Sequence, residues 1–140
     1  MESERRLELA QALLQEAVFA SRAKQAAGAS LMQGAGCGLG ARAEVALELS
    51  PRAAEIAREL WPRDLSPQEL DRARTATAAW VEQQDALDRK RNHFLKDFRT
   101  RHGFDRNAYS PDQLAAFDQG LARINTEVAE RLRAATQQLP

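Results

Sequence analysis

Cysteine is nearly absent from this 140-residue sequence, which contains only Cys37. A chain with one cysteine has no internal disulfide, so it does not belong to the small secreted domains that disulfides hold together. Histidine is almost as rare, because His93 and His102 are the only two. Two metal-binding histidines on one helical face would be three or four residues apart, and these are nine apart. The sequence therefore predicts no metal site and no cofactor.

Long apolar runs are missing too. No stretch approaches the roughly 18 consecutive apolar residues of a membrane-spanning helix. The first residues, Met1–Arg6, are mostly charged, unlike the apolar core of a secretory signal. We therefore expect a cytoplasmic protein with no membrane partner. Arginine outnumbers lysine 17 to 3, a bias typical of GC-rich bacterial genomes, so we expect a bacterial source and do not take arginine content as a sign of nucleic-acid binding.

Motifs for catalysis are the third absence. The segment 28–40 contains five of the seven glycines, but they alternate from Gly34 to Gly40 instead of following the G-x-G-x-x-G spacing of a dinucleotide loop. The Gly-Lys-Ser/Thr end of a phosphate-binding loop is also missing. No pair of acidic residues is marked by an apolar surround that would raise a carboxyl pKa for acid–base catalysis. We interpret the segment as a connector and Cys37 as an incidental thiol, and the sequence favours a protein that is not an enzyme.

What the sequence does contain is helical periodicity. No alternating β-rich run is present, so we predict an all-α helical bundle that forms one domain over residues 1–140. The expected elements are a helix over 3–27, the Gly-rich connector over 28–40, short helices over 41–61, and two long helices over 67–101 and 111–138. Its C-terminal half is expected to be a long, antiparallel, coiled-coil-like hairpin, because the connection between the two long helices is short.

Three Ser-Pro pairs, at residues 50, 66 and 110, mark the expected helix starts. A serine side chain can accept a hydrogen bond from the first turn of a helix, and proline suits the first helical position because it lacks an N–H. Two of the pairs also carry a capping box, since Glu69 follows Ser66 by three residues and Gln113 follows Ser110 by three.

The two long helices each carry an apolar stripe with alternating spacings of three and four residues, which is the pattern of a coiled-coil seam. The stripe of the first helix consists of Leu70, Ala73, Thr77, Trp80, Gln84, Leu87, Arg91, Phe94 and Phe98. The stripe of the second consists of Leu114, Phe117, Leu121, Ile124 and Val128. Gln84 and Arg91 are polar residues that interrupt the stripe of the first helix. We expect Arg91 either to pair with Glu127 or Glu130, or to extend to the edge of the seam.

Charge is unevenly distributed along a chain whose formal net charge is zero. Residues 1–88 carry 10 basic and 14 acidic side chains, residues 89–110 carry 7 and 2, and residues 111–140 carry 3 and 4. The basic stretch is interleaved with aromatic residues at the hairpin tip, a combination that suits binding to an acidic surface. The residues predicted to bind a partner are Arg89, His93, Lys96, Arg99, Arg101, Phe104, Arg106 and Tyr109.

These patterns favour a non-enzymatic interaction module, that is, an adaptor, chaperone or inhibitor that binds the acidic surface of another protein. Several alternatives remain open. The basic stretch can be a solvated face that balances acidic residues of the same molecule, and Phe104 and Tyr109 can be a small cap on the hairpin. The protein can also be a self-assembling homo-oligomer. Nucleic-acid binding is less favoured, because the net charge is zero.

Overall fold

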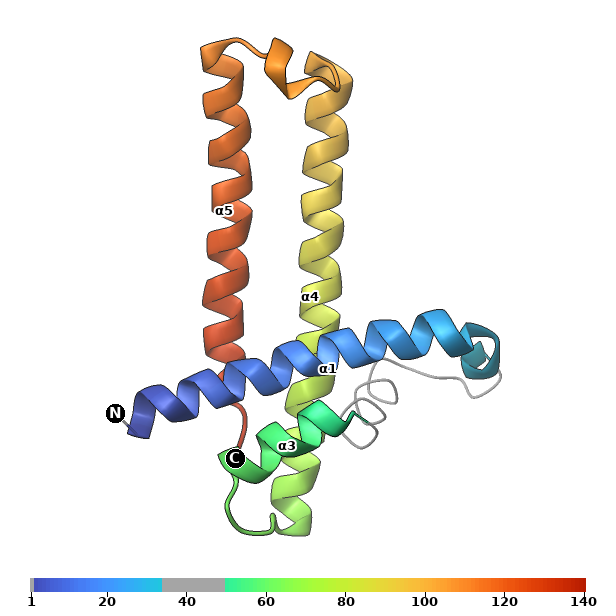
Figure 1. Ribbon diagram of the computed structural model, residues 1–140, viewed down its shortest axis with the longest axis vertical. Helices are drawn as coiled ribbons and strands as arrows, with labels where there is room; N and C mark the ends of the chain where they lie inside the picture. Colours follow the sequence, from blue (N-terminus) through green and yellow to red (C-terminus); the bar gives the residue numbers. More distant parts are fainter. Residues whose placement is uncertain (1, 34–49) are drawn as a thin grey trace. The chain divides into compact units, whose positions relative to one another are not determined.

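The structure is a computed structural model that describes residues 2–33 and 50–140. Every regular element in these residues is helical, which confirms the predicted all-α fold class (Figure 1). The elements are α1 (Glu2–Gln33), α3 (Pro51–Leu60), α4 (Pro67–His102), the short 3-10 helix η1 (Arg106–Ala108) and α5 (Pro111–Thr136). The chain divides into two compact units, one of Met1–Gln83 with Leu132–Pro140 and one of Gln84–Arg131.

Capping boxes start α4 and α5, as the sequence predicts. The backbone N–H of Ser66 donates to Glu69 Oε1 at 2.9 Å, and the N–H of Glu69 donates back to Ser66 Oγ at 3.1 Å. Ser110 and Gln113 make the same reciprocal pair at 2.9 and 3.2 Å. The hydrogen bond from the Ser66 backbone is the main cause that lowers the pKa of the Glu69 carboxyl. Ser50 caps α3 by accepting from the N–H of Ala53 at 3.2 Å.

Two helix boundaries differ from the prediction by more than one residue. Helix α1 continues to Gln33, past the expected end at residue 27 and through Gly28. One glycine in a helix costs only about 1 kcal/mol relative to alanine, and good helix formers follow it. Helix α5 ends at Thr136 rather than at 138. The rest of the predicted connector, the expected short helix over 41–49 and Cys37 lie outside the described residues.

The first unit has a core of tightly packed aliphatic residues around one tryptophan. Helix α1 packs against α3, and its buried surface is wide because neighbouring positions on several stripes are covered. The largest fully buried side chains of this unit are Leu13, Leu14, Ser21, Thr77, Trp80, Val81 and Leu139. The apolar surface of α1 is thus buried over several stripes rather than one.

The segment after α5 is held by side chains from three helical regions of the same unit. Leu139 is only 1% exposed. Arg72 donates to two successive carbonyls of the segment, at 3.1 and 3.3 Å. Trp61 Nε1 and an Arg6 guanidinium nitrogen both donate to the carbonyl of Pro140, at 2.8 and 3.0 Å. These hydrogen bonds satisfy carbonyls that have no helical partner once α5 has ended.

The second unit is a hairpin in which α4 and α5 run side by side in opposite directions (Figure 1). Their partners show the direction, because Lys90 pairs with Glu127 whereas Phe98, further along α4, packs on Phe117. The buried or half-buried residues on the facing sides are those of the predicted stripes, including Leu87, Phe94, Phe98, Leu114, Phe117, Leu121, Ile124 and Val128. The coiled-coil geometry of this seam stays a prediction.

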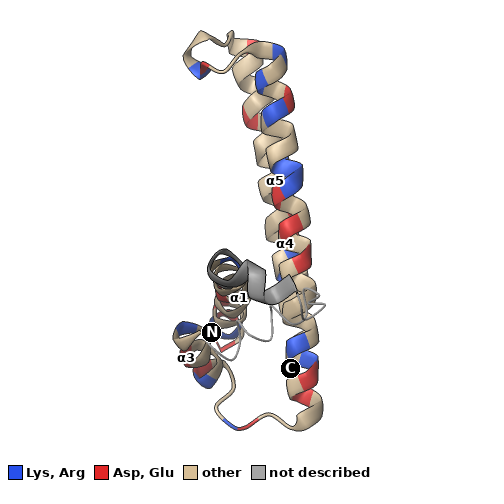
Figure 2. Cartoon of the chain, turned by 90° about the vertical axis from the view of Figure 1, so that its right-hand side faces the viewer, with Lys and Arg blue, Asp and Glu red and all other residues tan. Residues whose placement is uncertain are grey.

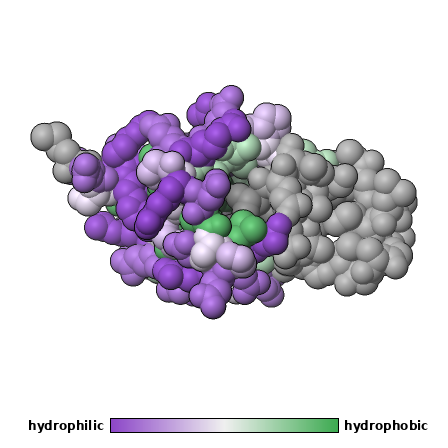
Figure 3. Space-filling model, turned by 90° about the horizontal axis from the view of Figure 1, so that it is seen from below, coloured by the Kyte–Doolittle hydropathy of each residue, from purple (hydrophilic) through white to green (hydrophobic). Residues whose placement is uncertain are grey.

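No described helix is long and apolar enough to cross a lipid bilayer. In the view of Figure 3, the described residues present mostly hydrophilic surface, with hydrophobic residues confined to a small area. The large hydrophobic side chains that are exposed among the described residues are Phe19 and Phe104.

Candidate functional site

The hairpin ends in a loop, residues 103–110, that is closed by Tyr109. Its ring is 7% exposed and packs on Phe98 and Phe117, with centroids 5.4 and 6.0 Å away. Its hydroxyl donates to the carbonyl of Gly103 at 2.5 Å. Tyr109 was among the residues predicted to bind a partner, but its side chain is enclosed by the hairpin itself. Of the two tip aromatics, Tyr109 therefore forms the cap.

The sequence contains a signal for this burial. Tyr109 immediately precedes the N-cap Ser110 of α5, and a hydrophobic residue there commonly packs against the residue four positions after the cap. That residue is Leu114, which packs against the same cluster as Tyr109. The pattern is a hydrophobic staple at the start of α5. Phe104 precedes the N-cap Asp105 of η1, but that helix has only three residues and therefore no fourth helical position for Phe104 to pack against.

Phe104 has the opposite environment. Its side chain is 82% exposed, although phenylalanine is among the residues most often found buried. It follows Gly103, whose φ of +97° lies in the left-handed region that glycine adopts at low cost. It precedes Asp105, whose carboxylate accepts from the Asn107 N–H at 2.9 Å. The backbone on both sides of Phe104 is thus fixed by hydrogen bonds, while its ring faces solvent.

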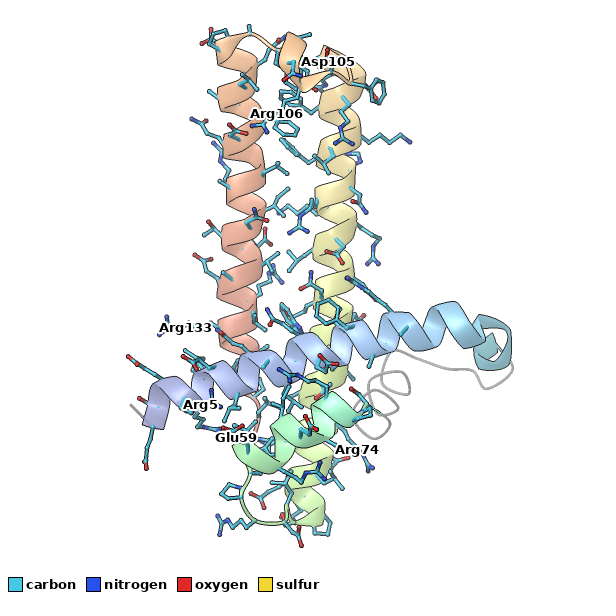
Figure 4. The ribbon with its side chains drawn as sticks, in the orientation of Figure 1. Arg5, Glu59, Arg74, Asp105, Arg106 and Arg133 are labelled. Atoms are coloured by element: carbon cyan, nitrogen blue, oxygen red, sulfur yellow. The ribbon has the colours of Figure 1, made fainter. Side chains whose placement is uncertain are left out.

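Four cations of α4 and the tip loop, here termed the engaged cations, are already bound to carboxylates of the same hairpin. They are Lys90 with Glu127 at 2.7 Å, Arg91 with Asp88 at 3.8 Å, Arg101 with Asp97 at 3.4 Å, and Arg106 with Asp118 at 3.1 Å. Arg106 turns from the loop toward α5, and its guanidinium also lies 5.8 Å from the centre of the Phe117 ring (Figure 4). The hydrogen bond from Lys90 is the main cause that lowers the pKa of the Glu127 carboxyl.

Arg91 does not reach either of its predicted partners. It donates to the side-chain oxygen of Asn125 at 3.0 Å. Glu127 is instead taken by Lys90 and by Arg131, which lies 3.2 Å from it. Arg91 thus reaches the opposite helix, as expected, but through an amide group.

Three other cations of α4 are exposed and form no ion pair with any described residue: Arg89, Lys96 and Arg99. We term them the outer-face cations. Lys96 lies seven residues after Arg89 and Arg99 ten residues after it, which corresponds to about 10 and 15 Å along a helix. The exposed His93 lies between the first two. Leu87 and Phe98, which face α5, are on the other side of the helix.

The second unit as a whole has nearly equal numbers of basic and acidic side chains, so any positive excess is confined to part of its surface. Residues 84–131 carry nine basic and eight acidic side chains, and both signs are distributed along the hairpin (Figure 2). Of the four acidic residues beside the tip, Asp97 and Asp118 each hold an engaged cation. The expected positive excess is thus found on the outward side of α4, and not at the tip where Arg101 and Arg106 lie.

A groove between α1 and α3 is the other place where charged side chains meet. Leu9 and Ile56 are among its lining residues, together with Arg5, Glu8 and Glu59. Arg5 pairs with Glu59, as Figure 4 shows, and lies 3.4 Å from Glu8. The charged groups of Arg5, Glu8 and Glu59 are thus paired with one another inside the groove. Among the described residues, no group of three or more His, Cys, Asp or Glu side chains is arranged to hold a metal ion.

Comparisons with known proteins give no match: no protein family, no curated protein and no solved structure is significantly similar to the chain.

Proposed function

We propose that this protein is a non-enzymatic interaction module that binds the acidic surface of another protein through the outward side of α4. The observation that carries this proposal is the contrast between two sets of arginines and lysines on one hairpin. The engaged cations have carboxylate partners at 2.7 to 3.8 Å. The outer-face cations have none among the described residues and lie on one side of a helix. They are available to carboxylates of a second molecule.

The energetics favour such a use. An exposed ion pair contributes only about 0.2–1 kcal/mol, so a solvated cation gains little from an isolated partner. Successive outer-face cations are about 10 and 5 Å apart along the helix, close to the Debye length of about 8 Å at physiological salt, so the fields of neighbouring cations overlap. Their combined field accelerates encounter with an acidic surface and orients it.

A protein partner fits better than nucleic acid. A phosphate backbone presents regularly spaced negative charge, and the eight acidic side chains of residues 84–131 would lie close to it. A protein surface presents carboxylates at discrete positions, so it can meet the outer-face cations and avoid the acidic groups of α5. An adaptor, a chaperone and an inhibitor, each acting in the cytoplasm, would all use a face of this kind.

Co-purification from the source organism tests the proposal. The full chain is immobilised, and bound proteins are identified by mass spectrometry after nuclease treatment. The outer-face variant replaces Arg89, Lys96 and Arg99 by glutamine, and a matched control replaces the exposed Arg52, Arg58 and Arg63 of the first unit, so that both lose three positive charges. We expect an acidic protein that is retained by the wild type and the control and lost from the outer-face variant.

Three results would overturn the proposal. The first is that no protein is retained above background by the wild type. The second is that the retained protein binds both variants equally. The third is that nuclease treatment removes everything that binds, which would favour nucleic acid. Retention of further copies of the same chain alone would favour the self-assembling alternative.

A further inference from the structure

We infer that Phe104 is the apolar anchor of the same interaction, and that it enters an apolar pocket beside the acidic surface of the partner protein. This inference rests on the proposed function. Phe104 lies only five residues beyond Arg99, the last of the outer-face cations, so one partner would contact both. A phenylalanine that is 82% exposed buries little apolar surface in the hairpin. Aromatic residues that enter a desolvated pocket, together with arginine, dominate the binding energy of protein interfaces.

The loop is built to present this ring without rearrangement. Gly103 is fixed on one side by its N–H, which donates to the carbonyl of Arg99 at 2.8 Å, and on the other by the Tyr109 hydroxyl. Asp105 is fixed through its carboxylate and through its carbonyl, which accepts from the Ala108 N–H at 3.0 Å. Phe104 lies between these two fixed residues. Binding through it therefore orders little backbone, which preserves affinity.

Tyr109 has a defined part in this arrangement as a positioning residue. Its ring is held in the aromatic cluster by Phe98 and Phe117, and only its hydroxyl reaches Gly103. Replacing it by phenylalanine keeps the ring and removes that one hydrogen bond. The loop end next to Phe104 would then be free to move, so the ring would lose part of its preorganisation.

The charge around the loop favours a protein pocket over a lipid surface. Residues 96–118 carry four basic and four acidic side chains. A flat anionic bilayer would meet both signs and gain little net attraction, because surface potential attracts basic and repels acidic groups alike. A pocket in a protein can accept one ring and arrange its own charges around it. The occupant is therefore a protein.

Site-specific photocrosslinking tests the inference. The photoreactive residue p-benzoylphenylalanine replaces Phe104 in one full-length variant, Lys96 in a second and the exposed Gln119 of α5 in a third, and each is irradiated in a lysate of the source organism. We expect positions 104 and 96 to label the same protein and position 119 to give background. Peptide mapping should locate the label from position 104 on apolar residues close to Asp or Glu in the partner sequence.

The two hypotheses fail in different ways. If position 96 labels a protein and position 104 gives only the background seen at position 119, the anchor is wrong and the proposed function stands. If neither position labels a protein, both are wrong. If position 104 labels lipid or nucleic acid, the inference is wrong as to the occupant.

Affinity for the crosslinked protein, measured by titration calorimetry, then tests the positioning role. We expect Phe104→Ala to weaken binding by about tenfold or more, and Tyr109→Phe to weaken it by about threefold, as expected for one hydrogen bond. In the Phe104→Ala background, Tyr109→Phe should have no further effect. A merely structural role of Tyr109 would weaken binding in both backgrounds, and that result would overturn the positioning role.

Discussion

Replacing Gly120 by alanine separates two opposing effects on the hairpin. Gly120 is a helical residue of α5, where helix propensity alone favours alanine by about 1 kcal/mol. A Cβ atom at this position, however, would lie 2.2 Å from Cζ and 2.4 Å from Cε2 of Phe94. Atoms cannot approach so closely, so the ring of Phe94 has to move. It is confined by Phe98 and Phe117, whose ring centres are 5.9 and 6.1 Å away.

Displacing a confined ring costs about 1–3 kcal/mol, as other overpacked cores show. Set against the gain in propensity, Gly120→Ala should lower the free energy of unfolding by about 1 kcal/mol. The measurement is urea unfolding followed by circular dichroism at 222 nm. A matched background is Phe94→Ala, which removes the ring. In that background Gly120→Ala should raise the free energy of unfolding by about 1 kcal/mol, since only propensity remains. Stabilisation in both backgrounds would refute the close packing of α4 on α5.

Three other predictions concern stability. Gly103→Ala should cost about 1 kcal/mol in urea unfolding, because φ is +97° there although a Cβ would meet nothing within 4 Å, and an unchanged stability would contradict this reading. Leu139→Ala should cost about 2–5 kcal/mol, because the side chain is 1% exposed, and a loss below about 1 kcal/mol would show that the terminal segment is not packed. The hydrogen bond from Lys90 lowers the pKa of the Glu127 carboxyl. The ionised carboxylate therefore stabilises the fold at pH values above the unfolded-state pKa of about 4.3, and this stabilisation is lost as the pH falls through the lower folded-state pKa. Carboxyl NMR should show this lowered midpoint, and Lys90→Met should raise it; an unchanged midpoint would contradict the contact.

Local signals in the sequence predicted the helix starts and the facing sides of the hairpin. The reciprocal bonds of Ser66 with Glu69 and of Ser110 with Gln113 need only residues three positions apart, so they can be read directly from the chain. The stripes of α4 and α5 follow from helical periodicity in the same way. The end of α1 was missed because one glycine, Gly28, does not stop a helix whose following residues favour it.

Contacts between residues far apart in the sequence determine features of the candidate site that local sequence signals did not predict. Lys90 and Arg106 are engaged by carboxylates of α5, and the partner of Lys90 is 37 residues away. Arg91 and Arg101 instead pair within α4, with Asp88 and Asp97 three and four residues before them. Sequence spacing therefore predicted eight partner-binding residues as one group, although Arg101 and Arg106 have carboxylate partners and Tyr109 is enclosed. The exposure of Phe104 likewise follows from the loop that Tyr109 closes, and not from the residue itself.

The most direct test of the proposed function compares two triple variants of the same hairpin by the dissociation constant for the co-purified partner. One replaces the outer-face cations by glutamine, and the other replaces the engaged cations Lys90, Arg101 and Arg106. Both lower the net charge by three, so their long-range electrostatic effects are alike. At physiological salt, we predict that the first weakens binding at least about tenfold more than the second, which corresponds to about 1.4 kcal/mol. Equal weakening by the two variants would contradict a binding surface on the outward side of α4.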